Sequence, residues 1–418
     1  MTITRKNIVI ILRNFKRKTG ANSTVLDLSE ALYQLGHNVN LGLYKDTLFS
    51  TLKYSKYSET TIPLDNIFIV PEKYKSNIYK PTANVSLKEY LAVVVKQTIE
   101  TLLKLFISRE KTFLNLLSSA DIIFIAAAIS DKDFNMLRSS TNAVIVRNHA
   151  GSPAAFENYF LSSKEFLEAA DSKKPDYVKY CLRYDALLFQ APDQANDCAL
   201  RDRELKSRCF VVPPSCQEHK VLAASQLSSP YQQDRRSIAY VGSIQPRKAQ
   251  HIAVEAFSKL AEKYPDTDLH FIGGGLYKEY GVNLNKMVKQ YLLSERIFLH
   301  GHRPDYLRFM AHAEFVIQTS EAEGVSRILR EAMLMQMPII SFSISGTSRL
   351  LRSGIDALLV EPYDIDAFSD AMAHLLSKPS TGRKLAATAY KEYLLNNSWP
   401  AYATNLKRVV EDLSDLRF

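Results

Sequence analysis

Short runs of consecutive apolar residues alternate along the chain with longer segments whose apolar residues recur at helical spacing. Runs rich in Val, Ile, Leu and Phe suit strands buried on both faces of a parallel sheet, and their alternation with helices is typical of an α/β protein. The runs predict strands over 7–12, 38–43, 122–126, 143–147, 186–190, 209–212, 237–241, 269–272, 297–299, 315–318 and 338–342.

The helical spacing completes the same pattern twice. It predicts helices over 23–35, 87–117, 252–264 and 327–336, and a helical tail over 367–418 broken at Trp399. The broad apolar face of 87–117 favours a core helix over one lying on a membrane. Two copies of the pattern predict two Rossmann-like, doubly wound domains facing a cleft, over 1–214 and 237–384, with the polar, proline-containing segment 215–236 as the linker.

Composition is consistent with two ordinary globular domains. The chain has 418 residues, of which 46% are hydrophobic and 23% charged, and about 150 residues make an average domain. The longest apolar run, 122–129, is far shorter than the ~20 residues of a membrane-spanning helix. The first twenty residues lack the apolar core of a secretory signal. We therefore expect a soluble, cytoplasmic protein.

The net charge of +9 is concentrated near the start of the chain. Residues 1–120 hold 17 basic and 9 acidic side chains, and a basic cluster at 13–18 follows the first predicted strand. Such a surface is a solvated face, or it attracts nucleic acid, an anionic membrane or a phosphorylated substrate. No basic block with interleaved aromatic residues continues beyond Lys18, and no zinc-finger spacing appears, which disfavours nucleic acid. We expect an anionic or lipid-linked acceptor, with possible peripheral contact at the inner face of an anionic membrane.

Neither the cysteines nor the glycine triplet gives a cofactor signature. The four cysteines include no C-x-x-C pair, which predicts free thiols rather than a metal site. Gly273-Gly274-Gly275 lacks the G-x-G-x-x-G spacing of a dinucleotide site.

Glycine marks the region where ligand chemistry is expected. Nine of the fourteen glycines lie between Gly242 and Gly354. The loop from Gly242 to Lys248 follows a predicted strand and precedes a helix, so Arg247 and Lys248 can meet a diphosphate there, unless the loop is only a basic surface.

A second loop carries carboxylates around the start of a helix. Glu323 can accept hydrogen bonds from sugar hydroxyls, Gly324 lets its own amide and that of Val325 turn toward phosphate, and Glu331 can reach a ribose diol. The alternative is a structural pair, in which Glu331 forms a salt bridge with Arg327 or Arg330.

These elements, in this order, resemble the retaining nucleotide-sugar glycosyltransferases of family 4, known as glycosyl transferases group 1, with the GT-B fold. The resemblance covers the loop at 242–248, the glycine turn at 273–275, the Glu323-x(7)-Glu331 element and the stretch 338–364 with its phosphate-loop-like segment at 345–349. It is weaker over the first 215 residues. In such relatives the closing helices, here 385–418, return to the N-terminal domain.

The resemblance implies roles for individual residues. Lys248 would neutralise the donor diphosphate, Glu331 would hold the ribose, and Glu323 would contact the transferred sugar, with His149 near the sugar from the other domain. The implied catalytic residues are His149, Lys248 and Glu323. The implied substrate-binding residues are Gly20, Gly242, Ser243, Arg247, Lys248, Gly274, Arg303, Glu323, Gly324, Val325, Ser326 and Glu331.

The chain also departs from the family pattern. Ser243 replaces an Arg, Ala249 a Gly, and Arg349 a common Glu, while Val325 and Ser326 replace the Phe and Gly of Glu-Gly-Phe-Gly. These changes predict an altered donor or weaker catalysis, with Arg247 or Arg327 as substitutes for the lost Arg.

The resemblance implies a hexosyltransferase that uses a nucleotide-sugar donor and a sugar, lipid-linked or other hydroxyl acceptor, without metal or cofactor. A nucleotide-sugar epimerase on the same fold and a catalytically inactive binding partner are the alternatives. The triplet Asp131-Lys132-Asp133 could be the metal-binding Asp-x-Asp of a different glycosyltransferase fold, or a helix start.

Overall fold

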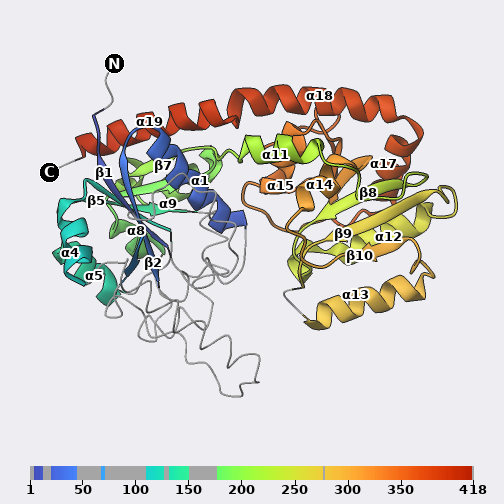
Figure 1. Cartoon of the computed structure of the whole chain (residues 1–418), viewed down its shortest axis with the longest axis horizontal. Coiled ribbons are helices and arrows are strands. Elements are labelled where there is room, and N and C mark those ends of the chain that lie inside the picture. Colours follow the sequence, from blue (N-terminus) through green and yellow to red (C-terminus); the bar gives the residue numbers. More distant parts are fainter. Residues whose placement is uncertain are drawn as a thin grey trace. The chain divides into compact units, whose positions relative to one another are not determined.

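The protein folds into two compact units. The structure is a computed structural model that describes residues 4–12, 20–44, 67–70, 110–126, 131–149, 177–275 and 278–416. The first unit comprises Met1–Pro213 and Tyr402–Phe418, and the second comprises Pro214–Ala401 (Figure 1).

The described strands of the first unit form one parallel sheet. Its order is β3-β2-β1-β4-β5-β6-β7. The strands are β1 (Asn7–Leu12), β2 (Asn38–Tyr44), β3 (Ile67–Val70), β4 (Ile122–Ile125), β5 (Val144–Asn148), β6 (Ala186–Phe189) and β7 (Cys209–Val211). Except for β3, each coincides with a predicted strand to within one residue at either end.

Helices of the first unit pack their apolar side chains onto this sheet. Val9 and Ile123 point from the sheet into a core shared with Leu117, Phe134 and Tyr184. The described helices are α1 (Gly20–Gln34), α4 (Glu110–Ser119), α5 (Asp131–Ser139), α8 (Tyr177–Leu182), α9 (Pro192–Arg201) and α10 (Arg203–Lys206). Most of the predicted helix 87–117 lies outside the described residues.

The second unit repeats the design with a parallel sheet of order β10-β9-β8-β11-β12-β13. Its strands are β8 (Arg236–Val241), β9 (Thr267–Ile272), β10 (Ile297–Leu299), β11 (Phe315–Gln318), β12 (Ile339–Phe342) and β13 (Leu358–Val360). Its helices are α11 (Glu218–Ser225), the 3₁₀ turn η5 (Pro246–Lys248), α12 (Gln250–Leu260), α13 (Lys278–Gln290), α14 (Tyr306–Ala311), α15 (Arg327–Leu334), α16 (Ser345–Ser348), α17 (Ile365–Ser377), α18 (Pro379–Asn396) and the start of α19 (Trp399–Asp415).

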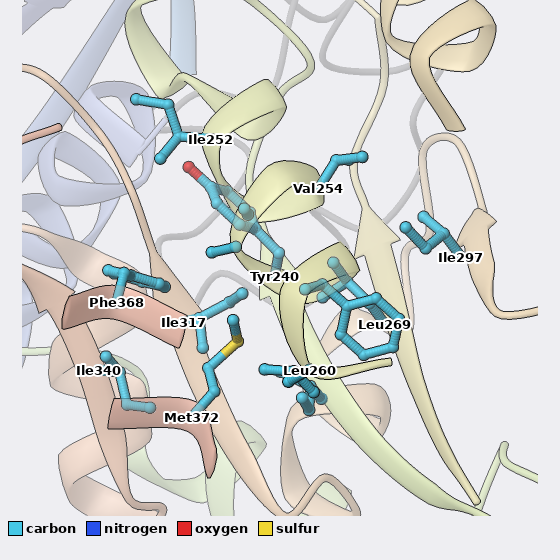
Figure 2. Close-up of a cluster of buried hydrophobic side chains, with 14 of the residues drawn as sticks. Tyr240, Ile252, Val254, Leu260, Leu269, Ile297, Ile317, Ile340, Phe368 and Met372 are labelled. Atoms are coloured by element: carbon cyan, nitrogen blue, oxygen red, sulfur yellow. The ribbon is translucent and has the colours of Figure 1, made fainter. Parts of the chain in front are cut away.

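Both faces of this second sheet are covered, which explains its unbroken apolar strands. Ile238 and Tyr240 of β8 belong to a core with α12, α13 and α17, drawn in Figure 2. Ala239 and Val241, which alternate with them, belong to another core with α11, α14, α15 and α18. Because successive side chains point to opposite faces of a strand, the two cores lie on opposite sides of the sheet. The fold class predicted for this half is confirmed.

Two predicted segments differ from what the structure shows. Residues 215–236, expected as a linker, contain α11 and belong to the second unit, since Val221 and Ala224 are buried and α11 packs against α14 and α15. The predicted helical tail is interrupted before Pro379 as well as before Trp399. Helix α18 belongs to the second unit, and the residues from Tyr402 onward belong to the first. Within the described parts of the chain, no helix combines the length and hydropathy needed to cross a membrane.

Candidate active site

The predicted site residues of the second unit gather where the strand order of its sheet reverses. From β8 the chain goes to β9 on one side, and β11 then pairs on the other side of β8. Loops that follow neighbouring parallel strands at such a switch point flank a crevice, which is where α/β sheets bind ligands. The loop after β8 contains Lys248, and the loop after β11 contains Glu323.

The loop after β8 is fixed by its neighbours. It ends in the turn η5, and Ala249 then adopts a left-handed conformation with φ of 47° before α12 begins. The backbone amide of Glu321 donates to the carbonyl of Arg247 (3.0 Å), and the Thr319 hydroxyl donates to the carbonyl of Ala249 (2.8 Å). The loop is therefore held directly against the loop after β11.

Lys248 and Glu323 form the centre of the site. The Lys248 ammonium donates to Oε1 of Glu323, and Nη1 of Arg247 lies 3.7 Å from Oε2. The side chains of Lys248 and Glu323 are 15% and 10% exposed, so the pair is largely withdrawn from water. Burial raises the pKa of Glu323, but Lys248 and Arg247 outweigh it and hold the pKa below its usual value. The site thus keeps an ionised carboxylate between two cations.

Polar side chains on the other side of the same loop complete the contacts of Glu323. Nε2 of Gln318, the last residue of β11, donates to Glu323 Oε1 (2.8 Å) and to Ser320 Oγ (3.1 Å). The Ser326 hydroxyl donates to Oε1 of Gln318 (3.1 Å), and its oxygen caps α15 by accepting from the amide of Leu329. Gln318 is not among the residues predicted from the sequence; its signal there is a polar residue that ends an apolar strand.

Glu331 is buried completely, one turn into α15. Nε of Arg327 donates to its Oε1 (2.8 Å), and the Tyr306 hydroxyl lies 2.8 Å and 3.0 Å from its two oxygens. Burial, followed by the Glu331 charge, raises the pKa of Tyr306 well above its usual value, so the hydroxyl stays a donor. The salt bridge with Arg327 is the structural alternative that the sequence left open, and Tyr306 is a second partner that the sequence analysis missed.

Two glycines allow backbone segments of the site to touch. A Cβ on Gly273 would collide with the carbonyl of Gly242, and a Cβ on Gly346 would collide with that of Glu323. Gly346 lies in α16, within the segment that resembles a phosphate loop, and Arg349 beyond it donates to the carbonyl of Gly324 (3.1 Å). Both glycines are thus required by close packing around the loops of the site.

The remaining predicted residues of the second unit have local partners. The Ser243 hydroxyl accepts from Nε2 of Gln245 (2.7 Å), and Gly274 lies against His302. Arg303, on the loop after β10, donates to both carboxylate oxygens of Asp305 at 2.9 Å. Val325 is half-buried on the loop between Glu323 and α15.

Gly20 and His149 belong to the first unit. Gly20 is the first residue of α1. His149 follows β5, is buried, and stacks on Phe189 with ring centroids 4.7 Å apart. Burial, with a smaller contribution from Arg147, lowers its pKa well below the usual value, so the imidazole is neutral at pH 7. Residues 13–19, which carry the basic cluster after β1, lie outside the described residues.

Metal-ligating side chains do not cluster in the described ranges. No group of three or more His, Cys, Asp or Glu there could hold a metal ion. All four cysteines are free thiols, as predicted, and three of them are buried. Asp131 begins α5, which agrees with the reading of the Asp-x-Asp triplet as a helix start.

Two parallel, helix-flanked sheets in succession, with loops of the second converging at its switch point, define the GT-B class of fold. Residues 226–392 match the family described as glycosyl transferases group 1. The structure of Anabaena Alr3699/HepE in complex with UDP-glucose superimposes with a TM-score of 0.69 at 16% identity, covering 98% of this chain and 100% of that one. At that identity the likeness shows the fold.

Curated relatives include two named glycosyltransferases. The chain is 24% identical over 283 residues to a D-inositol 3-phosphate glycosyltransferase of Corynebacterium urealyticum, covering 62% of this chain and 64% of the relative. It is 25% identical over 165 residues to an alpha-D-kanosaminyltransferase of Streptomyces kanamyceticus, covering 37% and 40%. The matched regions therefore span less than two thirds of these relatives.

Proposed function

We propose that the protein is a retaining hexosyltransferase of family 4, which transfers a sugar from a nucleoside diphosphate to a hydroxyl acceptor. The observation that carries the proposal is the placement of Lys248 and Arg247 against Glu323 at the switch point of the second sheet. The family match over residues 226–392 supports it. The two cations suit a diphosphate, and the carboxylate suits the hydroxyls of a hexose.

In the proposed reaction, the bond between the anomeric carbon and the diphosphate oxygen breaks, and the electron pair stays on the diphosphate. Lys248 and Arg247 stabilise the negative charge that develops there, which is the electrostatic contribution with the largest effect in such transfers. The acceptor oxygen bonds to the anomeric carbon on the face that the diphosphate leaves, and the hydroxyl proton passes to the departing diphosphate. The proposal includes no metal or cofactor.

Glu323 and Glu331 have different parts in this proposal. Glu323 accepts hydrogen bonds from hydroxyls of the transferred sugar, whereas Glu331 faces the ribose. In the structure Tyr306 and Arg327 already donate to the oxygens of Glu331, so a ribose hydroxyl would share the carboxylate with these two donors. His149 is proposed to contribute a neutral imidazole near the sugar.

The donor and the acceptor are proposed only as chemical classes. The HepE structure contains UDP-glucose, so UDP-sugars are the first donors to test. The acceptor is a glycan or a lipid-linked hydroxyl. The basic residues Arg13, Lys16, Arg17 and Lys18 would draw the protein to an anionic membrane surface.

Three measurements test these proposals. Calorimetry with UDP, GDP and ADP should identify one preferred nucleotide. Assays of nucleoside diphosphate release from the corresponding nucleotide sugars should then show slow hydrolysis of the donor. Formation of an epimer without release of nucleoside diphosphate would favour the epimerase alternative, and absence of all nucleotide binding would favour an inactive homologue.

Co-sedimentation with vesicles should increase with anionic lipid and decrease with salt; independence from both would contradict the membrane contact.

A further inference from the structure

Gln318 is a buried polar residue whose side-chain amide donates to Glu323. It ends the apolar strand β11, where Phe315, Val316 and Ile317 are buried, and only 3% of Gln318 is exposed. A buried amide must find partners for its donors and its acceptor, and here they are Glu323, Ser320 and Ser326. Gln318 therefore links the helix cap to the carboxylate.

The direction of these hydrogen bonds is set by the helix. The amide of Leu329 donates to Ser326, which leaves the Ser326 hydroxyl proton to point at Oε1 of Gln318. A glutamine side chain has one oxygen and one nitrogen at its end, so fixing the oxygen also fixes the nitrogen. Nε2 must then face Glu323, and the chain of donors from α15 ends on the carboxylate.

This orientation matters most when a diphosphate competes for Lys248. Any diphosphate that binds Lys248 draws the ammonium away from Glu323, which then loses its closest cation. The Gln318 amide carries no charge and so is not drawn to the diphosphate. It can keep the carboxylate in place while leaving its negative charge available to sugar hydroxyls.

We propose that Gln318 and Ser326 are positioning residues that hold Glu323 in the orientation that receives the transferred sugar. The inference rests on the proposed function. It assigns a positioning role to Ser326, which stands where the related family has glycine. The replacement of that glycine therefore does not weaken catalysis. It adds the hydroxyl that orients Gln318.

The test compares variants that remove or keep each hydrogen bond. Gln318→Ala removes the amide, Ser326→Gly removes the hydroxyl, and Ser326→Thr keeps it. Glycine and threonine are both accepted at a helix N-cap, so neither change at Ser326 should unfold α15. Ser369→Ala is the matched control, because Ser369 is 7% exposed against 6% for Ser326 and lies in α17.

Expected results separate binding from turnover. UDP affinity, measured by calorimetry, should stay within about threefold of wild type in every variant. UDP lacks the transferred sugar, and the network contacts Glu323, the carboxylate proposed to bind that sugar. The kcat for the UDP-sugar should fall about tenfold or more in Gln318→Ala and Ser326→Gly, and stay near wild type in Ser326→Thr and Ser369→Ala. The double variant Gln318→Ala, Ser326→Gly should be no slower than Gln318→Ala, because both substitutions break the same chain of hydrogen bonds to Glu323.

Several outcomes would overturn the inference. Wild-type kcat in Gln318→Ala and Ser326→Gly, equal losses in Ser326→Thr and Ser326→Gly, or losses that multiply in the double variant would each do so. A stability cycle between Ser326→Gly and Glu323→Gln provides a readout that does not depend on activity. If the two changes are coupled in that cycle but the wild type binds no nucleoside diphosphate, the ordering of Glu323 is supported and the proposed function is overturned. If the two changes are not coupled, the hydrogen-bond network itself is overturned.

Discussion

The Lys248 ammonium hydrogen-bonds the Glu323 carboxylate across 75 positions of sequence. Their meeting follows from the pairing of β8 with β11, since the loop after each strand begins at the same edge of the sheet. A lysine and a glutamate held in this way neutralise each other in a largely buried position.

Replacing Lys248 with Met should abolish turnover with little change in fold. The variant keeps the aliphatic part of the side chain and removes the charge that would stabilise the departing diphosphate, so release of nucleoside diphosphate should fall by about 100-fold or more. Lys259→Met is the control, because Lys259 pairs with Asp366 on the exposed side of α12. Comparable turnover in Lys248→Met and Lys259→Met would reject the assignment of the site.

The same variant should change the pH response of stability. With Lys248 present, the pKa of Glu323 lies below its usual value, so the pair contributes stability above the unfolded pKa of about 4.3 and loses it as pH falls. Without Lys248, burial dominates and the carboxyl takes up its proton at a higher pH. Thermal unfolding from pH 7 to pH 4 should show the advantage of wild type over Lys248→Met shrinking toward pH 4; a constant difference would contradict it.

Tyr306→Phe should destabilise the second unit and weaken nucleotide binding. It leaves the buried Glu331 carboxylate with fewer donors, at a cost of about 1–3 kcal/mol in the free energy of unfolding. Tyr264→Phe is matched to it, because the Tyr264 hydroxyl donates to a neutral carbonyl, that of Ala373. Urea denaturation should rank Tyr306→Phe as the less stable variant; the reverse order would show that the contact with Glu331 adds nothing.

Gly273 and Gly275, two positions apart in the glycine triplet, offer a paired test of backbone packing. Gly273→Ala places a methyl group into the Gly242 carbonyl, so the loops after β8 and β9 must separate, with a cost of about 1–3 kcal/mol or more typical of overpacking. Gly275→Ala adds the same methyl group where nothing lies within 4 Å. Gly273→Ala alone should lose UDP affinity and stability, and equal effects in both variants would contradict the close approach.

His149 should make the protein sensitive to mild acid. Because its folded pKa is lowered, the unfolded chain binds a proton at His149 below about pH 6.5 that the folded chain does not bind. Stability should therefore fall with decreasing pH by up to about 1.4 kcal/mol per pH unit from this residue. Comparing wild type with His149→Gln between pH 7 and pH 5 isolates the effect, and parallel pH profiles would show that the imidazole is already accessible to protons.

Most of the strands could be predicted because they are short apolar runs between turn residues. The predicted runs at 7–12, 297–299 and 315–318 coincide with β1, β10 and β11. The prediction of a linker over 215–236 is wrong because it rested on local composition alone. The prolines and polar residues of this segment resemble a linker locally, while Val221 and Ala224 acquire their partners on α14 and α15 only in the folded unit.

The sequence by itself determined the class of fold and the two-fold repetition, and it singled out Lys248, Arg247, Glu323 and Glu331 as candidates, because strand periodicity and charged loops are local properties of the chain. Only the tertiary structure decided how these residues are partnered. Hydrogen bonds between Gln318 and Glu323, or between Tyr306 and Glu331, depend on distances that spacing along the chain does not fix. They arise because parallel pairing brings the loop after β11 against that after β8, and because burial obliges each polar group there to find a partner.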